Sequence, residues 1–531
     1  MKKRICSVLL AATFAVSLAA CGGSGSATSD TTPQAGAVEA QSSEAPKRFV
    51  LGEKSITVQL DPMYVADQNG FTYCYMIYDC LVESDHQGNY EPALAESWSV
   101  ADDGVTWAFN LRKGVRFQNG QDFTSADVVC SYQRVLDEPT CNMYIDHWNM
   151  LDSVKAIDDY TVEIKTKEPF AMFLASVGWT WIIPHEAYEQ YGPELFSEHR
   201  EIQAGTGPWM LTEYNEGQNW VAKKNPNCWK PNESYFDEVE VRGLNETATA
   251  ISAHLAGDLT ANTNITDEML SMYSGSEDRI QTRVEEAAAI FYYCQYNCAE
   301  GEPFADPNMR LAFEYAINRQ AIADGFFAGK NGGVQNGVWC PSTYGYDTGY
   351  PAYEYNPEKA KEFLAASGYD GREIVLNVKT TEVYAQEVGL AIAEDLNSVG
   401  INAKVEPIEA ATMNTIRADG DYDIFMVTQI HADGDAYSHL NKRIVLDAHH
   451  SNYVNDELNA LIEESNRELD SEKRIELMHE INRIIREAPA SQSNIVQYND
   501  VVALNKGIIN VPVYPDNVHY YRYVTYDPSQ A

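Results

Sequence analysis

The chain has 531 residues, of which 44% are hydrophobic, and its formal net charge is −40 at pH 7. This excess of carboxylates disfavours nucleic acids and anionic membrane surfaces as partners, because both attract clustered lysine and arginine. The acidic surface first of all favours solubility, and a preference for cationic solutes is a weaker inference from it.

The first twenty residues have the features of a secretory signal peptide. Residues 2–4 are basic, and the apolar run at 5–18 that follows is too short to span a bilayer. The run ends in Leu-Ala-Ala-Cys, which resembles the lipobox of bacterial lipoproteins. The alternative is an ordinary signal peptide with an incidental cysteine. We therefore expect residues 1–20 to be a signal peptide and Cys21 to be lipidated.

Residues 21–46 consist largely of Gly, Ser, Thr, Ala and Gln, so this segment buries too little apolar surface to offset its ordering entropy. We expect it to be a flexible, lipidated tether. No later stretch approaches the roughly 18 apolar residues that a membrane helix needs. The remainder, about 485 residues, exceeds one ordinary core and predicts several lobes outside the cytoplasm.

Residues 105–126 form the first clear structural unit. Positions 105–111 alternate between polar and apolar residues as a strand does, Lys113-Gly114 suggests a turn, and 115–117 would be the returning strand. Thr124 is suited to cap a helix that begins near Ala126. All of these residues are predicted to be scaffold.

A βαβ unit is predicted further along. Residues 373–379 alternate as a strand, 384–399 have helical apolar spacing, Gly400 is a helix stop, and 401–405 is the next strand. The two strands should be parallel. A second helix is expected at 471–486, with an apolar face that serves packing. This alternation of strands and helices predicts an α/β protein.

No motif for catalysis or for a cofactor is visible. A dinucleotide-binding GxGxxG after a strand, a P-loop and a GxSxG elbow are all missing from the sequence, and the His and Cys spacings do not suit zinc. We therefore expect neither an enzyme, nor a cofactor, nor a metal site. Eight cysteines follow Cys21, and their pairing cannot be read from the sequence. If Cys294 and Cys298 share a strand, they lie about 13 Å apart and cannot bridge.

Several motifs occur in a fixed order. They include Leu-Val-Glu-Ser-Asp at 81–85, Glu-Pro-Ala-Leu-Ala-Glu-Ser-Trp at 91–98, Trp-Ala-Phe-Asn-Leu-Arg-Lys-Gly-Val-Arg-Phe at 107–117, Gly-Thr-Gly-Pro-Trp at 205–209 and Ala-Ile-Asn-Arg at 316–319. They closely resemble the signature of the extracellular solute-binding protein family 5, the oligopeptide-, dipeptide- and nickel-binding components of bacterial ABC importers. The resemblance covers nearly all of residues 50–531.

The resemblance implies the two-lobed α/β fold of periplasmic binding proteins, of the large type II class with an extra inserted small lobe. Hinge crossings are expected near Tyr292 and Gln497. The implied division is lobe I at 47–85, 201–290 and 498–531, the small lobe at 86–200, and lobe II at 291–497.

The implied function is that of a substrate-binding lipoprotein, held to the membrane by the lipid on Cys21. It would capture peptides or a related small solute outside the cytoplasm. Closure of its lobes, as a monomer, would present the ligand to an ABC permease and its ATPase. Two alternatives stay open: a receptor for a metal chelate, a sugar or another cation, and, from another class, a lipoprotein hydrolase.

The family resemblance also points to ligand-binding residues. Peptide-binding relatives pair an Asp at the end of a Trp-x-x-Asp stretch with the peptide's α-amino group, and Asp433 occupies that place here, although Ile430 replaces the Trp. The alternative is that Asp433 is an exposed turn residue, since two Asp flank Gly434. Tyr437 and Trp339 are expected to line the cleft, as aromatic side chains often do.

Overall fold

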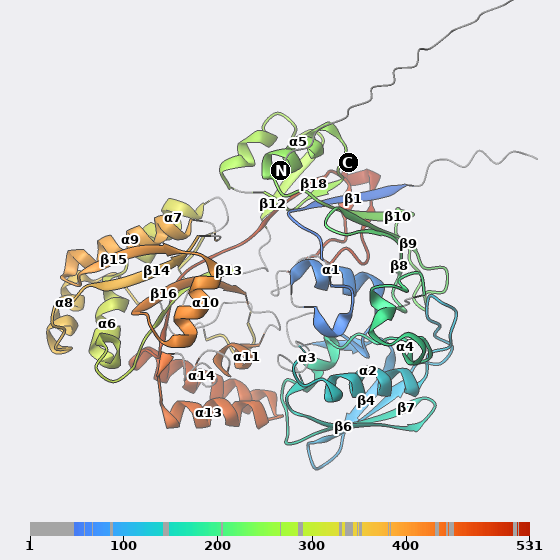
Figure 1. The fold of residues 1–531 in the computed structure, drawn as a ribbon, viewed down its shortest axis with the longest axis horizontal. Coiled ribbons are helices and arrows are strands. Elements are labelled where there is room, and N and C mark those ends of the chain that lie inside the picture. The colour runs from blue at the N-terminus through green and yellow to red at the C-terminus, as the bar shows by residue number, and fades with distance from the viewer. Residues whose placement is uncertain are drawn as a thin grey trace, which may run out of the picture. The chain divides into compact units, whose positions relative to one another are not determined.

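The computed structural model describes residues 47–531 apart from 58, 66, 85–88, 142–147, 203–204, 266, 285–289, 329–331, 335–342, 348, 350–352, 381, 383, 431–434, 442–443, 445–450, 513–517 and 519. In this part of the chain the strands form sheets of seven, five and four strands and two small two-stranded sheets (Figure 1). Among these residues no helix combines the length and apolar character that a membrane span requires.

The seven-stranded sheet has the order β12-β18-β11-β1-β10-β9-β8. Its central strand β1 is buried at five of six positions, the pattern of a strand that is covered on both faces. β1 pairs in parallel with β10 and β11, and the other pairs are antiparallel. The bounds are β1 Arg48–Glu53, β8 Trp209–Asn215, β9 Asn219–Lys224, β10 Glu238–Gly243, β11 Ala261–Asn262, β12 Ile280–Val284 and β18 Val501–Asn505.

The four-stranded sheet is antiparallel throughout, in the order β4-β5-β7-β6. Helix α2 packs against it, and its cap is the predicted one: Thr124 Oγ1 accepts a hydrogen bond from the Ala126 N–H, and Asp127 accepts one from the Thr124 N–H at 2.8 Å. The bounds are β4 Ala95–Val100, β5 Thr106–Leu111, β6 Leu151–Asp158, β7 Thr161–Thr166 and α2 Ser125–Asp137.

The predicted return strand at 115–117 is wrong. Strand β5 pairs with β4 on one side and with β7 on the other, so both of its edges are taken by other strands. Residue Arg116 forms only an isolated bridge with Asp122. The turn at Lys113-Gly114 therefore leads out of the sheet.

The five-stranded sheet, in the order β15-β14-β16-β13-β17, contains the predicted βαβ unit. β14 and β15 are parallel neighbours, and α9 between them ends at Gly400, whose φ of 101° is the left-handed conformation of a glycine cap. The unit is confirmed. The bounds are β13 Ile290–Tyr296, β14 Ile374–Lys379, β15 Ala403–Ile408, β16 Ile424–Ile430, β17 Gln492–Tyr498 and α9 Ala385–Val399.

The chain passes between the seven-stranded and the five-stranded sheet at two places. β12 is followed by β13 across residues 285–289, and β17 is followed by β18 across residues 499–500. Both passages adjoin the predicted crossings near Tyr292 and Gln497. The hinge motion itself stays a prediction.

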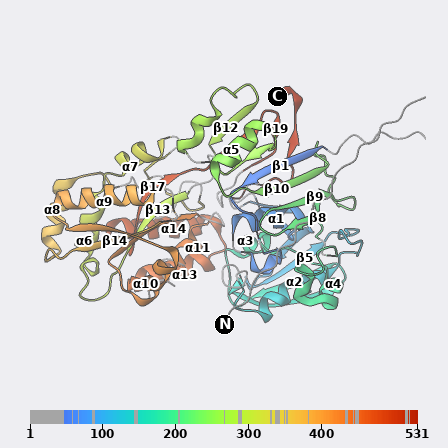
Figure 2. The same cartoon turned by 45° about the horizontal axis from the view of Figure 1, so that its top comes forward.

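Buried side chains form separate cores. The largest runs through the seven-stranded and four-stranded sheets, a second lies between the five-stranded sheet and helices α6 to α9, and a third is formed by α11, α13 and α14. The predicted helix at 471–486 is confirmed as α14, which packs beside α13 (Figure 2). The other α-helices and strands are α1 Gln68–Ile77, α3 Phe173–Gly178, α4 His185–Tyr191, α5 Thr247–Ala256, α6 Pro307–Ala316, α7 Arg319–Phe326, α8 Pro357–Ala366, α10 Ala410–Asp419, α11 Ala436–Leu440, α13 Asp456–Arg467, α14 Ser471–Glu487, β2 Val82–Ser84, β3 Tyr90–Pro92, β19 Ile508–Ile509 and β20 Thr525–Tyr526.

The cysteines of the described residues are thiols, with no disulfide among them. Cys294 lies inside β13 and Cys298 follows the end of that strand. The others are Cys74, Cys80, Cys130, Cys141 and Cys228.

Candidate functional site

Of the four residues predicted to carry function, one is described. Cys21, Trp339 and Asp433 lie outside the described residues. Tyr437 lies at the start of α11, half-buried, where it packs against the largest core and against the core of α11, α13 and α14. Desolvation and then the nearby carboxylates, Glu463 first, raise the pKa of Tyr437 to about 12, so its hydroxyl stays protonated at neutral pH.

A buried ion pair holds the start of α11 in place. Asp435 accepts the Tyr437 N–H at 2.9 Å, and its two carboxylate oxygens receive the Arg474 guanidinium at 2.5 and 2.8 Å. Both side chains of the pair are buried, which makes this bidentate contact a structural one. The residue two positions after Asp433 is therefore fully used by the scaffold.

His439, one turn after Asp435, joins two strands of the five-stranded sheet. Its Nδ1 lies 2.8 Å from the amide nitrogen of Gln429 on β16, and its Nε2 lies 3.0 Å from that of Gln492 on β17, which also donates to Asn494 Oδ1 at 2.9 Å. A neutral imidazole has one N–H, so only one of the two amides can donate to it and the other has to present its oxygen. The position of the proton on the imidazole therefore decides how the two amide groups are oriented.

Further amide groups lie on the same face of this sheet. Gln295 of β13 pairs with Gln492, and Phe291 pairs with both Gln429 and Gln497, so that their side chains point the same way. Buried polar atoms in proteins nearly always have hydrogen-bond partners. Here both amide atoms of Gln295 and the Oε1 atoms of Gln492 and Gln497 have none among the described residues. This surface, formed by Gln295, Gln429, Gln492, Gln497 and His439, is called the amide face below. Its amides suit a ligand that offers both donors and acceptors.

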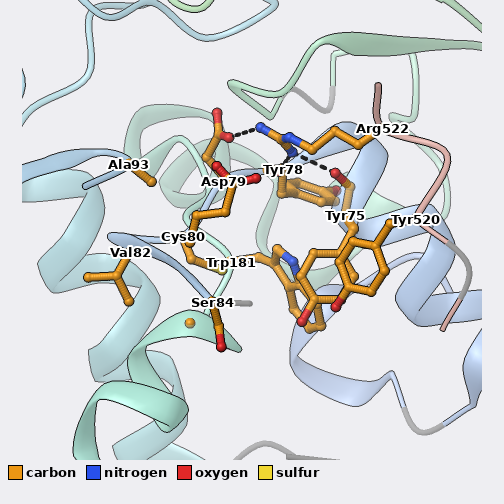
Figure 3. A pocket seen from close by; sticks show the side chains of 12 residues that line it. Tyr75, Tyr78, Asp79, Cys80, Val82, Ser84, Ala93, Trp181, Tyr520 and Arg522 are labelled. Atoms are coloured by element: carbon orange, nitrogen blue, oxygen red, sulfur yellow. Dashed lines mark hydrogen bonds and ion pairs between the residues drawn. The ribbon is translucent and has the colours of Figure 1, made fainter. Parts of the chain in front are cut away.

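A pocket lies between α1, β2 and the end of α3. Figure 3 shows three aromatic side chains gathered on one side of it and small side chains on the other. Tyr75 contacts the Trp181 and Tyr520 rings at centroid distances of 5.4 and 4.4 Å. The pocket is small, with a cavity volume of about 40 Å³, and its lining is Tyr75, Tyr78, Asp79, Cys80, Val82, Glu83, Ser84, Ala93, Gly178, Trp181, Tyr520 and Arg522.

The two opposite charges in this lining neutralise each other. Arg522 forms an ion pair with Asp79 and donates to the carbonyl oxygens of Tyr75 and Tyr78 at 2.5 and 2.9 Å (Figure 3). Asp79 also accepts from Thr206 Oγ1 at 2.7 Å and from Trp229 Nε1 at 2.9 Å. The hydrogen-bonding groups of Asp79 and Arg522 are thus used within the chain, and the pair is part of the scaffold rather than a ligand site.

The chemistry of the pocket offers little for a reaction or a metal. Burial raises the pKa of the Cys80 thiol well above its usual value, which keeps the sulfur protonated. Within the described residues, His, Cys, Asp and Glu form no group of three that suits a metal ion.

Comparison with known proteins identifies the family. The model of the bacterial extracellular solute-binding proteins, family 5 Middle, matches residues 89–442. The chain belongs to this family. Family 5 proteins are solute-binding proteins, which places this one outside the cytoplasm with a substrate-binding role in ABC import.

Individual relatives agree with this assignment. The glutathione-binding protein GsiB of Escherichia coli (strain K12) is 29% identical over 369 residues, which are 69% of this chain and 70% of GsiB. Two solved structures show the shared two-lobed fold. DppA from Helicobacter pylori, in complex with the peptide STSA, has a TM-score of 0.74, 23% identity, and coverage of 90% of this chain and 98% of DppA. NikA from Brucella suis, in complex with Fe(III)-EDTA, has a TM-score of 0.79, 20% identity, and coverage of 90% and 100%.

The sequence analysis predicted neither the amide face nor the pocket. The glutamines and the histidine of the amide face come from β13, β16, β17 and α11, and no spacing links them. Trp181 gave a weak signal, since Trp179-Thr180-Trp181 is an unusual concentration of indoles next to the apolar pair Ile182-Ile183.

Proposed function

We propose that this chain is the lipid-anchored receptor of an ABC importer and that its ligand is a short peptide. The observation that carries the proposal is the amide face of the five-stranded sheet, whose leftover donors and acceptors complement peptide groups. Two relatives support the ligand class: GsiB is a glutathione-binding protein, and DppA holds the peptide STSA.

Within this proposal, Asp433 pairs with the α-amino group of the peptide. In the sequence it comes three residues after Ile430, the last residue of β16, which is the strand that carries Gln429. A carboxylate and an ammonium group together offset a desolvation that neither could bear alone.

Replacement of Asp433 by Asn tests this role, because it keeps the shape of the side chain and removes its charge. We expect calorimetry with a tripeptide, or with a ligand identified by native mass spectrometry of the purified protein, to show a loss of about 2 to 5 kcal/mol of binding free energy. The matched control is Asp419→Asn, an exposed acid at the end of α10. An affinity of Asp433→Asn within about threefold of wild type would mean that Asp433 is only a turn residue.

Delivery rests on closure of lobes I and II, divided as the family resemblance implies, around the two passages between the sheets. Small-angle scattering should show a smaller radius of gyration with saturating peptide and unchanged secondary structure by circular dichroism. An unchanged radius together with breakdown of the peptide would favour the hydrolase alternative.

The lipid anchor is tested separately. Cys21→Ser removes the only thiol at the end of the predicted signal peptide, so this variant should shift from the membrane to the soluble fraction. A variant that remains as firmly membrane-bound as wild type would contradict lipidation at Cys21.

A further inference from the structure

We propose that the contact between residues 167–172 and the end of α13 is a clasp that holds the closed lobes together and so sets how fast a ligand is released. This inference rests on the proposed function and adds to it a control of release that does not depend on the chemistry of the ligand. It follows from where the two segments belong, from the contacts between them, and from the way each segment is anchored.

The two segments belong to different parts of the fold. Residues 167–172 connect β7 of the four-stranded sheet to α3, whereas α13 and α14 lie between β16 and β17 of the five-stranded sheet. In the division that the family resemblance implies, the first segment is in the small lobe and the second in lobe II. The backbone crosses between the seven-stranded and five-stranded sheets at 285–289 and 499–500, so this contact is an additional, noncovalent connection (Figure 1). Such a connection can open while both backbone crossings stay intact.

Polar contacts form the exposed part of the clasp. Arg467 at the end of α13 donates from Nε to Glu168 Oε2 at 2.5 Å, and one of its terminal nitrogens donates to Glu168 Oε1 at 3.3 Å. Close to this ion pair in both segments, the Ala171 N–H donates to the Asn466 carbonyl oxygen at 2.6 Å. The bidentate geometry aligns two segments that are about 300 residues apart in the chain.

Apolar contacts add to the ion pair. Leu469, in the turn between α13 and α14, lies against the β4–β5 turn, because a methyl group built on Gly104 would be 3.4 Å from Leu469 Cδ1 and 3.4 Å from Pro169 Cγ. Leu469 is still 42% exposed, so this contact is small. Tyr437 of α11 also packs against the largest core. Small, partly exposed contacts can form and break at a lower cost than a buried core.

Each half of the clasp is fixed within its own part of the fold. On the α13 side, the buried Arg474 donates from Nε to the Ser465 carbonyl oxygen at 2.8 Å and forms the bidentate pair with Asp435. On the other side, the Lys167 N–H donates to the Met150 carbonyl oxygen at 2.9 Å. Because both halves are anchored in this way, we expect the clasp to engage and separate as a unit.

The clasp would act on the equilibrium between open and closed lobes. A bound ligand leaves after the lobes open, so a weaker clasp should speed release by the same factor for ligands of different chemistry. A residue that contacts the ligand would instead change the release of different ligands by different factors. A comparison of two ligands therefore separates the two cases.

The experiment measures the dissociation rates of trialanine and triserine by surface plasmon resonance. Glu168→Lys places two cations against each other, so it should speed the release of both peptides about five- to tenfold. The double variant Glu168→Lys/Arg467→Glu restores opposite charges and should bring both rates back to within about threefold of wild type. The matched control is Glu163→Lys, which breaks an ion pair with Lys155 inside the four-stranded sheet and should leave both rates unchanged.

Hydrogen exchange tests the clasp in the free protein as well. The Ala171 N–H loses its acceptor when the clasp opens, so this amide should exchange faster in Arg467→Glu, although that substitution is on the other side of the contact. The double variant should restore slow exchange.

The outcomes distinguish the clasp from the peptide function. Release rates that change in Glu168→Lys no more than in Glu163→Lys would overturn the clasp and leave the peptide function standing. Unequal factors for the two peptides would also overturn it. Wild type that binds neither peptide would overturn the peptide function, and the exchange of Ala171 would then decide the clasp: equal rates in wild type and Arg467→Glu would overturn it.

Discussion

Buried polar groups are treated differently in two regions of this protein. Around Asp79 and Arg522, between α1 and the C-terminal segment, each charged atom meets a partner from the chain. On the amide face of the five-stranded sheet, Gln295, Gln492 and Gln497 keep atoms without partners among the described residues. Burial alone therefore does not distinguish scaffold from site.

This difference gives a criterion for telling a binding site from the scaffold. A polar group whose partners are all supplied by the chain stabilises the fold, and its removal should cost stability. A polar group with leftover capacity is a cost to the free protein that a ligand can remove, so its loss should cost binding. The two regions consequently predict opposite mutational behaviour.

The largest effect is expected for Asp79→Ala. The substitution leaves the Arg522 guanidinium buried without its counter-ion and removes the acceptor of Thr206 and Trp229, which should cost about 3 to 5 kcal/mol of unfolding free energy. Urea denaturation measures the loss. Glu480→Ala, which breaks an exposed ion pair on α14, is the control and should leave the midpoint unchanged. Equal losses of unfolding free energy in Asp79→Ala and Glu480→Ala would contradict the greater importance of the buried ion pair.

A pH-dependent effect of a few kcal/mol is expected from Glu53, at the end of β1. Desolvation and then the negative charge of Asp67 raise the pKa of this carboxyl to about 8 in the folded protein. Because Glu53 holds its proton more tightly in the folded than in the unfolded protein, it stabilises the fold at a pH below its ordinary pKa of 4.5. This stabilisation is lost as the pH rises toward 8. Glu53→Gln should therefore gain stability relative to wild type between pH 5 and 8.

Thermal unfolding of both proteins at several pH values in this range tests the sign. A difference between wild type and Glu53→Gln that stays constant from pH 5 to 8 would show that Glu53 does not titrate there.

Gln118 and Gln497 allow the scaffold and the amide face to be compared with the same residue type. The Gln118 oxygen, like that of Gln497, has no partner among the described residues, but its amide nitrogen donates to the Trp209 carbonyl oxygen at 2.7 Å and to that of Ile77 at 3.1 Å. Because these two hydrogen bonds are lost, Gln118→Leu should cost about 1 to 3 kcal/mol of stability. Gln497→Leu removes a buried oxygen without a partner among the described residues, so stability should change by less than about 1 kcal/mol. Peptide affinity should fall only in Gln497→Leu, by about threefold or more.

Urea denaturation and calorimetry on both variants give the two readouts. A larger stability loss for Gln497→Leu than for Gln118→Leu would mean that the amide face belongs to the scaffold.

Much of the fold was readable from local patterns. The βαβ unit, the end of α9 at Gly400 and the cap of α2 at Thr124 depend on residues that are neighbours in the chain, so period, cap and stop signals suffice. The ordered motifs likewise pointed to the family that the comparisons then showed. For the ligand site, the sequence named Asp433, Tyr437 and Trp339, of which only Tyr437 lies among the described residues.

Other features arose only from the tertiary structure. One edge of β5 pairs with β4 and the other with β7, which begins only at Thr161, and no local signal at 115–117 could exclude a nearer strand. Asp79 and Arg522 are 443 positions apart, and the amide face draws on β13, β16, β17 and α11. A local pattern records how a segment satisfies its own backbone and which face it buries. Which distant side chain then completes an ion pair, or leaves an amide without a partner, depends on how the segments pack.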